Sequence, residues 1–250
     1  TVSAPIRQAI EREIRAASDR VRLVPYPLSP IYLNEHGEAA PVILYAGRVH
    51  PEKGVHLLVD AFARAQSAGA TAGWNLRIVG PWETAQGGGG PGYRAQLKRL
   101  ARPAGAAVQL APPIFDETRL AQEYRRAAIF CYPSLAEFGE TFGLAALEAM
   151  GSGAAPIVSN LACFRDFVRP QENGLVFDHR RPDPAEALAS ELRRAIADAE
   201  LRERLRLAAW HTARDYALPR IARCYLDDFA DLLANPHANP CPRRYGFSHP

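Results

Sequence analysis

The chain has 250 residues, of which 48% are hydrophobic and 23% are charged, and its formal net charge at pH 7 is +3. This composition excludes an intrinsically disordered chain and suffices for one sizeable domain with additions at its ends. The small net charge, without a basic cluster interleaved with aromatics, argues against nucleic-acid binding, and no apolar run approaches the roughly 20 residues of a membrane span.

The amino-terminal part predicts a helix, a short strand and then a linker. Apolar spacing predicts the helix over 4–17 and the strand over 21–24. A proline-rich run over 25–30 opens the predicted linker, which extends over 25–40. Because the chain starts at Thr1 without a methionine, we expect it to be a fragment of a longer protein.

Short apolar runs alternate with helical or loop segments through the central part of the chain. This alternation is typical of a parallel sheet with helices on both faces, so the predicted fold class is α/β and Rossmann-like. Ligands of such sheets bind beyond the carboxyl ends of the strands. The predicted strands are 42–47, 75–80, 107–110, 128–132, 155–158 and 174–177.

Three helices are predicted after the last strand, followed by an irregular tail over 235–250 that is rich in proline and polar residues. The helices span 184–197, 199–216 and 219–234. The last one has an apolar face that we expect to be exposed in this chain. That face carries Ile221, Tyr225, Phe229 and Leu232.

A cationic loop follows the first central strand. Gly47 and Gly54 allow a sharp turn, and between them stand Arg48 and Lys53. Arginine offers a planar fork for two phosphate oxygens and lysine a compact point charge. This loop is therefore a candidate site for a diphosphate.

Two carboxylates, Glu140 and Glu148, stand with seven residues between them across a turn that opens a predicted helix. At ~1.5 Å per helical residue their Cα atoms are separated by roughly 12 Å, a reach that suits the two sugars of a sugar nucleotide. The backbone N–H groups of Phe142, Gly143 and Leu144 lie between them, at the helix end that favours an anion.

Together these segments resemble retaining glycosyltransferase family 4, specifically the carboxy-terminal, donor-binding domain of its two-domain GT-B architecture. The resemblance covers most of the chain. It rests on the order and spacing of several short motifs, each weak alone. These are Gly47-Arg48 with Lys53-Gly54, Ile78-Val79-Gly80, Cys131 to Ser134, Glu140 with Glu148, Glu148 to Gly153, Pro156 to Ser159 and Asn173 to Phe177.

The resemblance implies a role for each motif residue. Arg48 and Lys53 would bind the donor diphosphate, and Glu148 the ribose hydroxyls. Glu140 would hold hydroxyls of the transferred sugar, so that Glu140, Arg48 and Lys53 form the catalytic set with Glu140 positioning rather than attacking. Gly47, Phe142, Gly143 and Leu144 would complete the donor site.

The resemblance also implies a reaction: a hexose-type sugar passes from a nucleoside diphosphate sugar, as co-substrate, to a hydroxyl of a glycan, lipid or small-molecule acceptor, with retention. No cofactor or metal is expected. A nucleotide-sugar-binding module without turnover, and a phosphorylase or epimerase of the same architecture, remain alternatives.

The expected division of the chain follows the family. Residues 1–24 would be a remnant of the amino-terminal acceptor domain, which is otherwise missing, and 25–40 the linker. The donor-binding domain would span 41–218, and a helix over 219–234 would return to the acceptor domain, before the tail over 235–250.

The remaining features predict a cytoplasmic protein, or one attached peripherally to the inner membrane face. The four cysteines, Cys131, Cys163, Cys224 and Cys241, lack paired spacing, so reduced cysteines are expected rather than a zinc site or disulfides. The glycine run over 87–92 is expected to be a mobile insertion, with Trp82 and Tyr93 beside it as candidates to shape the sugar pocket.

Overall fold

A computed structural model describes residues 1–14, 21–33 and 37–234. Its centre is a six-stranded sheet in the order β3-β2-β1-β4-β5-β6, and every neighbouring pair of strands is parallel. The predicted α/β fold is confirmed, and all six predicted strands are present. They are β1 Ala40–Ala46, β2 Asn75–Val79, β3 Val108–Ala111, β4 Ala127–Tyr132, β5 Ala155–Ser159 and β6 Leu175–Phe177.

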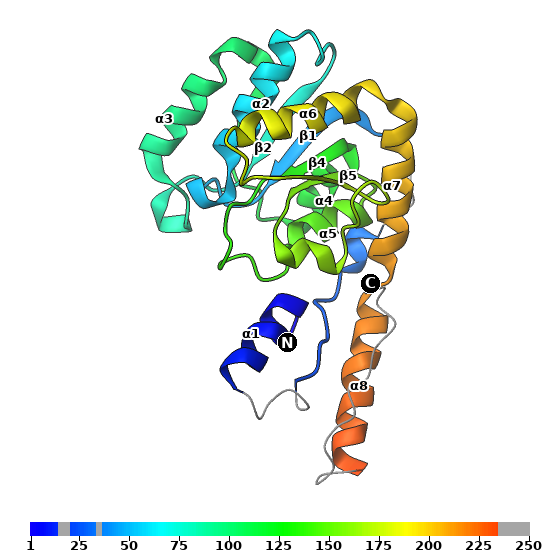
Figure 1. The fold of residues 1–250 in the computed structure, drawn as a ribbon. Helices are drawn as coiled ribbons and strands as arrows, with labels where there is room; N and C mark the ends of the chain where they lie inside the picture. The colour runs from blue at the N-terminus through cyan, green and yellow to red at the C-terminus, as the bar shows by residue number, and fades with distance from the viewer. Residues whose placement is uncertain (15–20, 34–36, 235–250) are drawn as a thin grey trace.

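Helices cover both faces of the sheet (Figure 1). Helices α2, α3 and α6 form one layer, while α4, α5 and α7 form the other. Aspartates begin several of them: Asp116, Asp183 and Asp198 each accept a hydrogen bond from a backbone N–H of the first turn. The helices are α1 Ala4–Glu13, α2 Val55–Ser67, α3 Gly90–Leu100, α4 Glu117–Arg126, α5 Leu144–Gly151, α6 Pro184–Ala197, α7 Ala199–Arg214 and α8 Leu218–Ala234.

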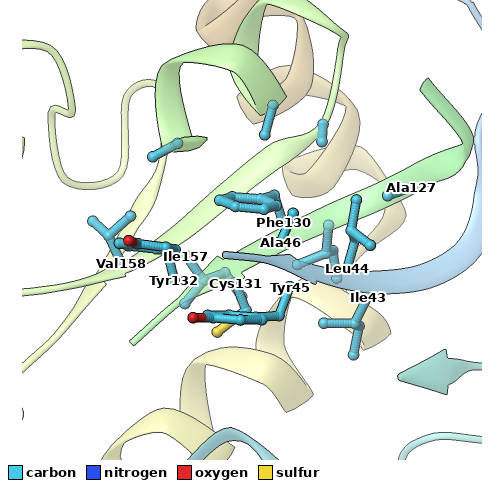
Figure 2. Close-up of a cluster of buried hydrophobic side chains, with 14 of the residues drawn as sticks. Ile43, Leu44, Tyr45, Ala46, Ala127, Phe130, Cys131, Tyr132, Ile157 and Val158 are labelled. Carbon is cyan, nitrogen blue, oxygen red and sulfur yellow. The ribbon is translucent and has the colours of Figure 1, made fainter. Parts of the chain in front are cut away.

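The core lies between the sheet and these two layers. Every residue of β4 is buried, as expected for a central parallel strand that is covered on both faces. Figure 2 shows side chains of β1, β4 and β5 packed together, with Tyr45 and Tyr132 at the carboxyl ends of neighbouring strands. The two rings are stacked, with centroids 5.7 Å apart. Aromatic packing therefore joins β1 to β4 at the point where both strands end.

The strand order reverses between β1 and β4, since the chain runs outward from β1 to β3 and then returns to the other side of β1. In open parallel sheets this reversal leaves a crevice beyond the carboxyl ends of the two central strands. The predicted cationic loop follows β1, and the segment with Glu140 follows β4. Topology thus brings the two sequence motifs to one crevice.

Two predictions for the amino-terminal segment need correction. The strand over 21–24 is wrong: these residues pair with no strand, and the Val24 N–H instead donates to the Thr1 carbonyl. The first helix ends at Glu13 rather than 17 in the described chain, and residues 15–17 lie outside the described residues. The predicted tail over 235–250 also lies outside them.

The glycine run is packed rather than a loose insertion. The Gly89 N–H donates to the Val49 carbonyl and the Gly90 N–H to the Trp82 carbonyl. A Cβ atom on Gly88 would lie 2.2 Å from the Trp82 backbone. Gly88 is therefore required for close packing against the Trp82 backbone, Gly89 bonds to the cationic loop, and Gly90 starts α3.

The segment predicted as a linker contacts the sheet domain. Leu28 is fully buried and forms an isolated parallel bridge with Ala217. Tyr32, in the 3-10 helix Pro30–Tyr32, is buried edge-on against Tyr124 of α4. The division of the chain into domains stays a prediction.

Helix α8 extends away from the sheet on the same side as α1 (Figure 1). Arg22 pairs with Asp228 of α8 at 3.3 Å. Among the described residues, no helix combines the length and apolar character needed to cross a membrane. The predicted exposure of the apolar face of α8 is confirmed for Tyr225, Phe229 and Leu232, and Leu226 and Leu233 are exposed as well. It is wrong for Ile221, which is 1% exposed because it packs into the hydrophobic core.

Gly54→Ala is expected to destabilise the fold by about 2 kcal/mol or more, because Gly54 has φ +65° and a Cβ there would lie 2.0 Å from the Pro133 carbonyl oxygen. Gly69→Ala is the matched control: its φ is +75°, but no atom lies near the added Cβ. It should cost only about 1 kcal/mol. Urea unfolding of both variants measures the difference, and equal losses would contradict the close approach of the loop to β4.

Candidate functional site

The loop after β1 is shaped by its own hydrogen bonds. The Tyr45 hydroxyl donates to the Arg48 carbonyl at 2.7 Å, and the loop closes in a 3-10 helix, Pro51–Lys53. The Arg48 guanidinium is about half exposed and contacts the Glu52 carboxylate and the Gly87 carbonyl. It therefore lies at the surface of the crevice, held between its own loop and the glycine run.

Lys53 points inward instead. Its Nζ lies 2.8 Å from Oε2 of Glu140, and only 7% of the lysine side chain and 10% of the glutamate side chain are exposed. Residues 87 positions apart in sequence thus form a buried ion pair at the carboxyl ends of β1 and β4. Such a pair needs good geometry and further hydrogen bonds to offset the loss of hydration.

Tyr132, the last residue of β4, completes the surroundings of this pair. Lys53 Nζ lies 5.8 Å from the centroid of its ring. Burial raises the pKa of Tyr132, and the Glu140 carboxylate raises it further through its charge and a hydrogen bond to the hydroxyl. The phenol therefore stays protonated and helps to hold the carboxylate.

Glu148 lies in the second turn of α5, largely buried. Its Oε2 accepts a hydrogen bond of 3.0 Å from the hydroxyl of Tyr124 in α4. Burial raises the pKa of Glu148 to about 7. The hydrogen bond from Tyr124 lowers this pKa, and the negative charge of Glu117 raises it. Near neutral pH this carboxyl exchanges between its protonated and ionised forms.

The start of α5 is fixed by tight packing. Gly143 has φ +86°, and a Cβ there would lie 2.4 Å from the Phe164 ring. Phe142 is buried next to Phe167, with ring centroids 5.3 Å apart, while Leu144 is partly exposed. The first N–H groups of a helix have no acceptor within the helix, so this end presents donors to an anion.

The structure joins some predicted site residues and separates others. Lys53 and Glu140 are in direct contact, and Arg48 lies in the same loop as Lys53 but contacts other groups. Glu148 contacts Tyr124. The sequence analysis did not predict that two tyrosines, Tyr132 and Tyr124, contact the acids. Tyr132 ends β4 and Tyr124 lies near the end of α4, and a tyrosine in such a position is the sequence feature that could have indicated them.

Beside the loop lies a cavity of about 100 Å³ that is lined by the ends of β2 and β3, by α3 and by Trp82. The Arg94 guanidinium stacks over the Trp82 ring at 4.3 Å. Tyr93 is buried, and its hydroxyl accepts a hydrogen bond from the His56 backbone N–H. Of the two aromatics beside the glycine run, only Trp82 therefore faces this cavity.

In the described part of the chain, no cluster of three or more His, Cys, Asp or Glu side chains is placed to hold a metal ion.

The chain is similar to known proteins over most of its length. A family model described as glycosyl transferases group 1 matches residues 34–211. A D-inositol 3-phosphate glycosyltransferase from Jonesia denitrificans is 33% identical over 179 residues, which are 70% of this chain and 39% of the relative. The chain thus spans about two fifths of the length of the curated relatives it matches.

Solved structures share the fold. Sucrose-phosphate synthase from Thermosynechococcus elongatus matches with a TM-score of 0.76 and 25% identity, over 93% of this chain and 58% of that chain. Anabaena HepE, solved in complex with UDP and glucose, matches with a TM-score of 0.73 and 18% identity, over 92% of this chain and 62% of that chain. These matches agree with the α/β architecture built above.

Proposed function

Because the chain belongs to the glycosyl transferases group 1 family, we propose that it binds the nucleoside diphosphate sugar in a reaction that transfers a hexose-type sugar to a hydroxyl acceptor. The observation that carries this proposal is the buried contact between Lys53 and Glu140, which joins the cationic loop to the acidic segment in one crevice. The acceptor would be a glycan, a lipid or a small molecule, bound with the help of a domain outside this chain.

Charge would hold the diphosphate. Lys53 Nζ, the exposed Arg48 guanidinium and the N–H groups at the start of α5 lie at the crevice where β1 and β4 end. Two fixed cations and a helix end favour an anion with two neighbouring phosphates. This arrangement supports a diphosphate site that requires no metal ion.

The two acids would hold the sugars at either end. Glu148, in the second turn of α5, would accept hydrogen bonds from the ribose hydroxyls, and Glu140 from hydroxyls of the transferred sugar. Lys53 contacts Glu140 directly, so its ammonium would lie beside the bound sugar and would reach the adjoining phosphate. The donor would therefore span the crevice from α4 to the loop after β1.

In the transfer step, the bond between the anomeric carbon and the diphosphate oxygen breaks. A bond from that carbon to the acceptor oxygen forms on the same face, which retains the configuration, and the acceptor proton passes to the departing phosphate. Negative charge grows on the diphosphate, where Lys53 and Arg48 stabilise it. Glu140 positions the sugar and does not attack it.

Calorimetric titration with UDP-glucose, UDP-N-acetylglucosamine and GDP-mannose tests the proposal. We expect at least one to bind, and Glu148→Ala to weaken its binding by about 1–3 kcal/mol through loss of charge-assisted hydrogen bonds. Absence of binding by the folded chain for every sugar nucleotide in a wider panel, or unchanged affinity in Glu148→Ala and Lys53→Ala, would refute the assignment.

Arg48→Ala is expected to weaken binding of the same sugar nucleotide by about 1–2 kcal/mol and to leave the free energy of unfolding within about 0.5 kcal/mol, because the side chain is half exposed and its ion pair is solvated. Arg165→Ala is the matched control, since Arg165 contacts Asn160 beyond β5. Titrations at 50 and 300 mM salt should show a smaller salt effect for Arg48→Ala than for the unchanged chain. An equal salt effect would contradict direct phosphate contact.

A further inference from the structure

Tyr124 makes a specific contact with the acid of α5. Its side chain is 1% exposed, and its hydroxyl donates to Oε2 of Glu148 at 3.0 Å. The ring is held on two sides: Tyr32 packs edge-on with centroids 5.7 Å apart, and Phe130 of β4 lies at 5.4 Å. A buried ring between two aromatic neighbours has little freedom to rotate, so its hydroxyl is fixed in place.

Among the described residues, no lysine, arginine or histidine forms an ion pair with the Glu148 carboxylate. The titratable groups that face it are Tyr124 and Glu117 of α4 and Tyr32 of the 3-10 helix before β1. Two are neutral phenols, and the third is another acid. Only Tyr124 among these three donates a hydrogen bond to it. This bond therefore holds Oε2 of the carboxylate against α4.

We propose that Tyr124 is a positioning residue, which holds Glu148 so that the carboxylate can accept hydrogen bonds from both ribose hydroxyls of a sugar nucleotide. This inference rests on the proposed function. A carboxylate offers about four lone-pair sites, and Tyr124 occupies one of them. The remaining sites match a diol, whose two hydroxyls both need acceptors. Without the phenol, the side chain would turn among several rotamers and would lose this preorganisation.

The contact also links binding to pH. The hydrogen bond from Tyr124 favours the ionised form of Glu148, while burial opposes it. Since the ionised form is the one that accepts from a diol, affinity should fall as the pH drops below about 7. Removing the phenol should raise the pKa of Glu148 further and move this fall to higher pH.

Tyr124→Phe tests the proposal, because it keeps the ring and deletes only the hydroxyl. The probe is UDP-glucose, or GDP-mannose if the panel selects it; both phosphates are esterified, so neither titrates between pH 6 and 8.5. We expect about tenfold weaker binding at pH 7 and a higher midpoint pH for the loss of affinity. Tyr216→Phe, which loses a buried hydroxyl bond to the Asp166 carbonyl, should leave both unchanged.

A double-mutant cycle separates positioning from a structural effect. In a Glu148→Ala background, Tyr124→Phe should cause no further loss of affinity, since the side chain that it orients has been removed. An equal loss in both backgrounds would overturn the proposal, as would an unchanged affinity and midpoint. If the Phe variant does not fold, Tyr124→Met, which fills the space with a flexible apolar side chain, gives the same comparison.

The failure of this inference differs from failure of the proposed function. If the unchanged chain binds no sugar nucleotide, the proposed function is wrong, and the inference falls with it. If the unchanged chain binds but Tyr124→Phe binds equally well at every pH, only the role of Tyr124 is wrong.

Discussion

Glu148→Gln is expected to stabilise the folded chain at pH 8 by about 3 kcal/mol while it weakens sugar-nucleotide binding. Burial raises the pKa of Glu148 from 4.5 to about 7, so the folded state holds its proton more tightly than the unfolded state does. Between these values stability falls as pH rises, and the full cost is present above pH 7. An amide at this position carries no charge and escapes that cost.

Urea unfolding of both proteins at pH 8 and at pH 5 measures this effect. The advantage of Glu148→Gln should be large at pH 8 and small at pH 5, where the carboxyl is mostly protonated in the folded state. Glu172→Gln, at an exposed position in the turn before β6, is the matched control and should change stability little at either pH. A variant no more stable than the unchanged chain at pH 8 would show that Glu148 is well compensated when ionised.

The expected trade between stability and binding has a physical reason. A ribose diol needs an acceptor, and an ionised carboxylate inside a cleft is a strong one because competing water is excluded. The same exclusion of water makes the free carboxylate costly. Glu148 would therefore be kept for binding, although an uncharged residue at this position would give a more stable fold.

Lys53→Met is expected to destabilise the fold by about 3–5 kcal/mol and to weaken binding of the same sugar nucleotide at least tenfold. The lysine is paired with Glu140 at 2.8 Å, with both side chains about nine-tenths buried, so the substitution leaves an uncompensated carboxylate in the crevice. Loss of one of the two cations at the proposed diphosphate site would weaken binding in this way. Chemical denaturation and calorimetry measure the two effects separately.

The double variant Lys53→Met, Glu140→Gln separates these causes. It should recover most of the lost stability, because no unpaired charge remains, but none of the lost affinity. Lys98→Met is the matched control: Lys98 is the other lysine of the chain and is exposed on α3. If the single variant were as stable as the control, the ion pair would contribute nothing to the fold.

Much of the fold could be predicted from the sequence because central parallel strands have an unambiguous pattern. The run before Gly47 and the run before Pro133 are continuous and apolar, and a strand covered on both faces requires this. The predicted strand over 21–24 is wrong, because an apolar run alone does not make a strand. Its residues have apolar character, but no neighbouring strand is available to pair with them.

The glycine run shows where local pattern misleads. Four consecutive glycines favour a mobile segment when nothing packs against them. Here Gly88 approaches the Trp82 backbone so closely that no side chain fits, and the N–H of the neighbouring Gly89 donates to the Val49 carbonyl of the cationic loop. Only the fold brings that loop and this run together.

The sequence by itself determined the strand pattern, the cationic loop and the spacing of two acids on one helix start, because these depend on residues close together in the chain. The tertiary structure decided which charges meet. Lys53 contacts Glu140 because β1 and β4 are neighbours at the point where strand order reverses, and Glu148 contacts Tyr124 because α4 packs beside α5. Contacts between distant segments depend on packing and burial, and burial is also what moves the pKa of Glu148 toward neutrality.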